Sequence, residues 1–206
     1  ATKQSFVYAL NRETGEPIWP IEERPVPAST VPGEKLSSTQ PFPTKPAAFD
    51  LQGRTEEDLI DYTPEIRQKV LAYARENNLF FPLFNPPVVA DSPDSYWPGA
   101  GLACPGGGGG LNIYSPAVAD PVAGVMYVAS SSGCSPYTLM PGVESPLDTS
   151  TQQTGTSHSE WSRAAGAAGR RGETSRPDRA DIDGLSIWKG PVGRITAIDM
   201  NTGEHL

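Results

Sequence analysis

Residues 6–19 read Phe-Val-Tyr-Ala-Leu-Asn-Arg-Glu-Thr-Gly-Glu-Pro-Ile-Trp, and residues 195–206 read Ile-Thr-Ala-Ile-Asp-Met-Asn-Thr-Gly-Glu-His-Leu. In each segment a short apolar run leads into an Asx-x-x-Thr-Gly turn. An Asx side chain can accept a hydrogen bond from the backbone two residues on, and glycine supplies the positive φ that closes such a turn. Both segments are therefore predicted to be β-hairpins.

The two hairpin segments match one another, which indicates an internal repeat. The matched pairs are Ala9 with Ala197, Asn11 with Asp199, Thr14 with Thr202, Gly15 with Gly203 and Glu16 with Glu204. A weaker third copy occupies residues 119–124, followed by an apolar strand at 125–129. Repeated strand–turn–strand units are typical of propellers and solenoids, in which each unit needs neighbours to bury its faces. We favour repeats over two unrelated hairpins with the same turn chemistry.

An insertion follows the first hairpin. Residues 20–54 are proline-rich and predict extended chain, and residues 55–58 predict a short helical turn. One helix is then expected, capped by Thr63 with Pro64 in its first position. The apolar segment 79–84 is expected to pack the insertion onto a larger body. The helix has one apolar face, formed by Ile66, Val70, Tyr73 and Ala74.

Composition excludes several classes of protein. The 206 residues include 22 prolines and 21 glycines, too many chain breakers for a compact helical bundle. The net charge is −8 and the basic residues are scattered, which argues against nucleic-acid binding. No apolar run approaches the roughly 18–20 residues of a membrane span, and the first residues lack the pattern of a signal peptide. Because the chain begins inside a strand-like segment, we expect a processed protein or a fragment.

The cysteines and a glycine run mark the middle of the chain. Cys104 and Cys134 permit one disulfide or two unpaired thiols, and their spacing matches no common zinc site. Residues 106–110 are five consecutive glycines. They form neither a phosphate loop nor a dinucleotide fingerprint, because no Gly-Lys-Ser/Thr ending and no helix signal follow. A flexible hinge and a loop that faces a ligand both remain open.

Four stretches together resemble the pyrroloquinoline-quinone (PQQ) dependent dehydrogenases, the quinoprotein glucose and alcohol dehydrogenase family, including its membrane-type glucose dehydrogenases. The stretches are 3–15 with 20–27, 38–46, 105–112, and 188–191 leading into 195–204. The resemblance implies an all-β fold: part of an eight-bladed β-propeller with tryptophan-docking repeats and one helical insertion. It also implies PQQ as cofactor and calcium as its metal, with calcium ligands that are not in this chain.

The family resemblance assigns roles to three residues. Lys3 falls where the family keeps a lysine that contacts PQQ, so it is the candidate catalytic and cofactor-binding residue. Asn112 and Gly110 are the other candidate cofactor-binding residues, while Ile113 stands where tryptophan is usual. The aspartate base of the family lies upstream of Lys3. We therefore expect the isolated chain to be inactive.

The resemblance also implies partners, a compartment and a division of the chain. It implies oxidation of a sugar or alcohol, electron transfer to a quinone or cytochrome, assembly with the remainder of the propeller, and a periplasmic location. A non-catalytic propeller module for protein binding or assembly is the alternative, and a carbohydrate-binding fragment is a third. Within one propeller domain we expect a blade hairpin at 1–19, the insertion at 20–98, the glycine-rich loop and blade strands at 99–143, a flexible loop at 144–184 and a blade hairpin at 185–206.

Overall fold

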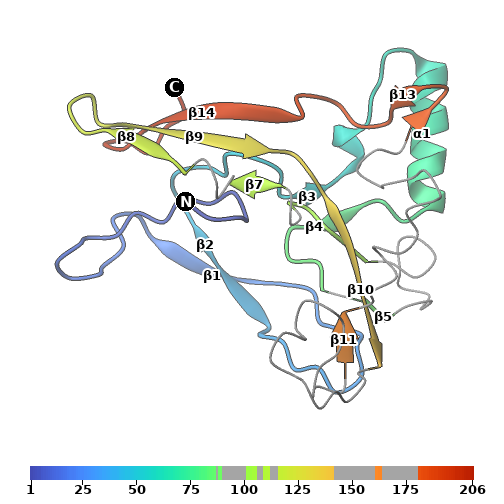
Figure 1. The fold of residues 1–206 in the computed structure, drawn as a ribbon, viewed down its shortest axis with the longest axis horizontal. Coiled ribbons are helices and arrows are strands. Elements are labelled where there is room, and N and C mark those ends of the chain that lie inside the picture. Colours follow the sequence, from blue (N-terminus) through green and yellow to red (C-terminus); the bar gives the residue numbers. More distant parts are fainter. Residues whose placement is uncertain (87, 90–100, 106–108, 112–115, 142–160, 164–180) are drawn as a thin grey trace, which may run out of the picture.

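The computed structural model describes residues 1–86, 88–89, 101–105, 109–111, 116–141, 161–163 and 181–206 (Figure 1). This part of the chain is built mainly from short strands. They are β1 Ile21–Pro25, β2 Thr39–Pro43, β3 Gly53–Arg54, β4 Phe81–Pro82, β5 Val88–Val89, β6 Gly101–Ala103, β7 Gly110–Leu111, β8 Val118–Asp120, β9 Val125–Ser131, β10 Ser135–Pro141, β11 Trp161–Arg163, β12 Asp181–Ile182, β13 Leu185–Ser186 and β14 Gly193–Asp199. The helical elements are the 3-10 turn η1 Glu56–Asp58 and the α-helix α1 Pro64–Glu76.

The sheet that positions the candidate site is centred on β9. Strand β14 pairs with β9 along its whole length, from Gly193 opposite Ser131 to Asp199 opposite Val125. Strands β7 and β8 pair with the other edge of β9, and all three pairings are antiparallel (Figure 1). The weaker third repeat is thus the β8–β9 hairpin. The glycine-rich loop enters the same sheet through β7.

The two matched hairpins have the same turn geometry. The amides of Asn11 and Asp199 each donate to the carbonyl five residues on, at 2.8 and 2.9 Å. The amides of Gly15 and Gly203 donate back to those Asx carbonyls at 2.7 Å, and both glycines have a φ of 76°. This geometry confirms the predicted Asx-x-x-Thr-Gly turns.

The N-terminal hairpin is shorter than the sequence predicts. Residues 6–10 form no strand in the described structure, and the hairpin is closed by a single bridge between Leu10 and Pro17. Proline has no backbone N–H and cannot extend an antiparallel ladder. In the C-terminal hairpin the corresponding bridge joins Ile198 and His205, and β14 continues beyond it along β9.

Helix α1 begins where the sequence predicts. The Thr63 hydroxyl accepts from the amide of Ile66 at 3.2 Å, and Pro64 occupies the first helical position. Val70 and Ala74 are buried. The short helical turn predicted at residues 55–58 is η1. Neither helical element in the described part of the chain has the length and apolarity that crossing a bilayer requires.

Two buried clusters hold these elements together. The larger lies between the insertion and the segment 187–188, and includes the disulfide; its members are Leu59, Ile60, Val70, Ala74, Leu79, Phe81, Cys104, Cys134, Ile187 and Trp188. The smaller lies under the β7–β9–β14 sheet and contains Val7, Phe49, Leu111, Val128 and Ile198. The segment 79–84 therefore packs inward through Leu79 and Phe81, as the sequence predicts.

Candidate functional site

Lys3 lies in a tight turn at the N-terminal end of the described chain. The amide of Thr2 donates to the carbonyl of Phe6 at 2.8 Å, and the amide of Ser5 donates to the carbonyl of Thr2 at 3.1 Å. The half-buried Lys3 side chain leaves this turn and its Nζ donates to the carbonyl of Leu111 at 3.0 Å. The contact spans 108 residues of sequence and fixes the ammonium at β7.

Glycine is required at position 110 because the backbone of Lys3 lies directly against it. Gly110 has a φ of 66°, a conformation that side-chain-bearing residues rarely adopt. A Cβ placed on it would lie 2.8 Å from the carbonyl carbon of Lys3, closer still to that carbonyl oxygen, and 3.2 Å from Cβ of Pro105. Lys3 and Gly110, both predicted from the sequence, are therefore in direct contact.

The glycine loop is anchored behind this contact. A Cβ on Gly109 would collide with the carbonyl oxygen of Gly133. The neighbouring Cys134 forms a disulfide with Cys104, with their Cα atoms 4.5 Å apart. The sequence left the pairing of these cysteines open, and the structure decides it. One end of the glycine loop is thereby covalently attached to the chain that follows β9.

Asn112 lies outside the described residues, as do residues 106–108 of the glycine loop and Ile113. The structure therefore places two of the three predicted site residues. Most of the predicted 144–184 loop also lies outside, but the short strands β11 and β12 fall within that range.

A buried carboxylate beside the loop anchor was missed by sequence reasoning. The Asp50 side chain is fully buried, and its Oδ1 accepts from Ser132 Oγ at 2.7 Å and from the Leu51 amide at 2.8 Å. Its Oδ2 lies 3.8 Å from Nε of Arg194. Asp50 follows a proline-rich stretch, and no local pattern distinguishes it from a solvated loop residue.

Arg54 is a second buried charge that the sequence did not indicate. The residue is 5% exposed, and its guanidinium lies 4.5 Å from the ring centroid of Trp188. It also approaches the carbonyl of Ser132 at 3.4 Å. Stacking on an aromatic face suits the planar, weakly hydrated guanidinium. Asp50 and Arg54 thus both contact Ser132, which directly precedes Gly133 and the disulfide-bonded Cys134.

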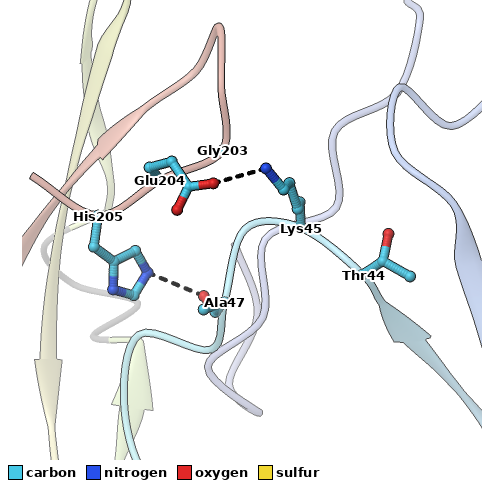
Figure 2. Close-up of a pocket in the computed structure, with 6 residues that line it drawn as sticks. All are labelled: Thr44, Lys45, Ala47, Gly203, Glu204 and His205. Carbon is cyan, nitrogen blue, oxygen red and sulfur yellow. Dashed lines mark hydrogen bonds and ion pairs between the residues drawn. The ribbon is translucent and has the colours of Figure 1, made fainter.

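An open pocket of about 350 Å³ lies elsewhere, between the insertion and the C-terminal hairpin (Figure 2). Lys45 Nζ pairs with Glu204 at 2.7 Å, and His205 Nε2 lies 3.1 Å from the carbonyl of Ala47. The hydrogen bond from Lys45 lowers the pKa of Glu204. These contacts join two segments across the pocket, and its lining includes neither Lys3 nor Gly110. We therefore interpret it as a structural junction.

Among the residues that the structure describes, no three His, Cys, Asp or Glu side chains are grouped closely enough to hold a metal ion. The site that remains is a lysine held against a glycine loop.

Comparisons with known proteins identify the family of the chain. The model of the PQQ glucose/ethanol/alcohol dehydrogenase β-propeller domain matches residues 1–206. The chain belongs to this family of PQQ-dependent quinoprotein dehydrogenases.

The chain is similar to parts of longer curated proteins. It is 28% identical to the glycerol dehydrogenase large subunits of Gluconobacter thailandicus and Gluconobacter oxydans, over 100% of its own length and 27% of theirs. It is also 28% identical to the quinate/shikimate dehydrogenase (quinone) of Acinetobacter baylyi, over 98% of the chain and 24% of that protein. The chain thus spans about a quarter of the length of these relatives. No solved structure matches it significantly.

Proposed function

We propose that this chain contributes the PQQ-contacting face of a dehydrogenase that oxidises a sugar or alcohol at a CH–OH group. The observation that carries the proposal is the contact of Lys3 with Gly110 and Leu111, in a chain of the PQQ family. The curated relatives are named for glycerol and for quinate or shikimate, all of which carry oxidisable hydroxyl groups. We extend this class of substrate to the present chain.

The described residues fit part of a PQQ site. PQQ, when bound, supplies an ortho-quinone that accepts two electrons from the substrate carbon. Lys3 has three N–H donors and uses one on the Leu111 carbonyl, so the others can serve a carboxylate or quinone oxygen. Its positive charge favours negative charge that develops on that oxygen. Gly110 has no side chain, and this lets the Lys3 backbone lie directly against β7, beside the Leu111 carbonyl that the ammonium contacts.

The rest of the assignment concerns the whole protein. We propose that Asn112 donates its amide to a cofactor oxygen, and that calcium is bound by residues outside this chain. Electrons would pass to a quinone, as the name of the Acinetobacter relative states for that enzyme, or to a cytochrome. A disulfide suits an oxidising compartment, which supports a periplasmic location.

We also propose that the chain completes an eight-bladed propeller with the remainder of its protein. Tryptophan docking is supported by one contact: a Cβ on Gly203 would lie 3.2 Å from Cζ2 of Trp19. Trp19 ends the first hairpin and Gly203 closes the turn of the last, so the contact joins two repeats.

Titration of the chain with PQQ, followed by absorbance and tryptophan fluorescence, tests the proposed site. Lys3→Ala removes a charge-assisted hydrogen bond and is expected to weaken binding roughly ten- to a hundredfold. Asn112→Ala is expected to weaken it less, because its amide is neutral. Lys69→Ala is the matched control, because that lysine makes an exposed ion pair with Asp183. Unchanged affinity in both site variants would refute the assignment.

A dye-reduction assay with PQQ, calcium and a panel of sugars and alcohols tests the activity of the isolated chain. We expect no turnover, because the resemblance places the aspartate base upstream of Lys3. Substrate-dependent turnover would contradict this expectation and would identify the substrate class directly.

A further inference from the structure

Ser5 is the most unusual residue near Lys3. Its φ is 65°, in the left-handed region that favours glycine, and the residue is fully buried. Its hydroxyl lies in the interior with no hydrogen-bond partner among the described residues. A strained backbone and an unsatisfied hydroxyl both disfavour serine at this position. Such costs persist only where the surrounding structure fixes the conformation, and they cluster at functional sites.

The surroundings fix Ser5 from both sides. Its amide donates to the carbonyl of Thr2 at 3.1 Å, which closes the turn that contains Lys3. Its carbonyl accepts from the amide of Phe49 at 3.0 Å, and Phe49 is 1% exposed in the cluster under the sheet. An extended Ser5 would direct its carbonyl away from Phe49 and open the turn. The left-handed conformation is therefore what joins the Lys3 turn to the core.

We propose that Ser5 is a positioning residue: its left-handed backbone holds the Lys3 turn so that the ammonium reaches the Leu111 carbonyl beside Gly110. Because Ser5 is fully buried, it acts through Lys3 and does not contact a ligand itself. This inference depends on the proposed function in one respect: the role of the Lys3 ammonium in binding PQQ. The placement of that ammonium can be measured without PQQ.

The experiment measures the reaction rate of each lysine amine with an acylating reagent, resolved by mass spectrometry on the folded full chain. A hydrogen bond to Leu111 shelters the Lys3 amine, whereas Lys69 is an exposed internal standard with 60% of its side chain accessible. Ser5→Gly adopts a φ of 65° without strain, so labelling of Lys3 should stay at the wild-type rate. Ser5→Val disfavours that φ strongly, and labelling of Lys3 should rise roughly five-fold while Lys69 is unchanged.

Asn78→Val is the matched control for general destabilisation. Asn78 also has a positive φ, 50°, but lies at the C-terminal end of α1. Valine there should lower the melting temperature and leave labelling of Lys3 unchanged. If Asn78→Val exposes Lys3 as much as Ser5→Val does, Ser5 has only a general structural role and the proposal is wrong. Wild-type labelling of Lys3 in a folded Ser5→Val chain overturns it equally.

A second pair of variants keeps the proposal testable if Ser5→Val does not fold. Ser5→Ala and Ser5→Gly both remove the unsatisfied hydroxyl, so their difference reports the backbone conformation. The glycine variant should melt about 2–4 °C above the alanine variant and label Lys3 more slowly. Equal melting and equal labelling would refute the proposal. If labelling follows the prediction but Lys3→Ala does not change PQQ affinity, the positioning role stands and the proposed cofactor role fails.

Discussion

Replacing Gly110 with alanine tests the contact on which the candidate site depends. Two costs are expected. The φ of 66° forces alanine into the left-handed region, at about 1–2 kcal/mol. The new Cβ would also lie 2.8 Å from the carbonyl carbon of Lys3 and closer still to its carbonyl oxygen, well inside ordinary contact at 3.4 Å, so the Lys3 turn or β7 must move. Overpacking of this kind typically costs about 1–3 kcal/mol.

Gly15→Ala separates the cost of the left-handed backbone from the cost of the steric clash, because only the first applies at Gly15. Gly15 has nearly the same φ, 76°, but a Cβ there would meet nothing within 4 Å. Both variants also restrict the unfolded chain equally, so that effect cancels in the comparison. Urea unfolding should therefore show that Gly110→Ala loses about 1–3 kcal/mol more stability than Gly15→Ala.

The same two variants should differ in cofactor binding. If Lys3 binds PQQ as proposed, displacing it weakens that contact, so PQQ affinity of Gly110→Ala should fall about tenfold or more. Gly15→Ala should bind PQQ as the wild type does. If Gly110→Ala loses no more stability than Gly15→Ala and keeps its affinity, the contact between Gly110 and Lys3 does not organise the site.

Three further predictions concern the elements around the site. Reducing the Cys104–Cys134 disulfide, or replacing both residues with alanine, reopens a loop of 30 residues and should cost about 3.6 kcal/mol in urea unfolding; an unchanged midpoint would contradict this. Lys45→Gln should make the melting temperature fall less steeply as the pH is lowered into the acid range. The lowered pKa of Glu204 gives stability that is present above its unfolded pKa and lost as pH falls through its folded pKa, and a wild-type pH profile would argue against this coupling. Thr63→Ala removes the N-cap of α1 and should cost about 1 kcal/mol, measured by thermal unfolding with circular dichroism.

The contact between Trp19 and Gly203 bears on how a quarter-length chain can fold. Trp19 and Gly203 are 184 residues apart in the sequence (203 − 19), yet they lie in contact, and Lys45 of the insertion pairs with Glu204 beside them. Each hairpin alone has few strand partners.

The sequence alone determined the features that depend on neighbouring residues. The Asx-x-x-Thr-Gly turns follow from the side chains of Asn11 and Asp199 and from the positive φ available to Gly15 and Gly203. The start of α1 follows from Thr63. The family resemblance also placed Lys3 and the glycine loop, because those motifs are contiguous in the sequence.

Only the tertiary structure decided what depends on distant segments. Lys3 reaches Leu111 across 108 residues, and Asp50 reaches Ser132 across 82. The disulfide, the burial of Arg54 on Trp188 and the left-handed backbone of Ser5 likewise arise from packing. No local pattern encodes them, because burial and the direction of a hydrogen bond are set by whichever remote segment the folded chain brings into contact. The turns could therefore be predicted from short-range chemistry, whereas the position of the ammonium could not.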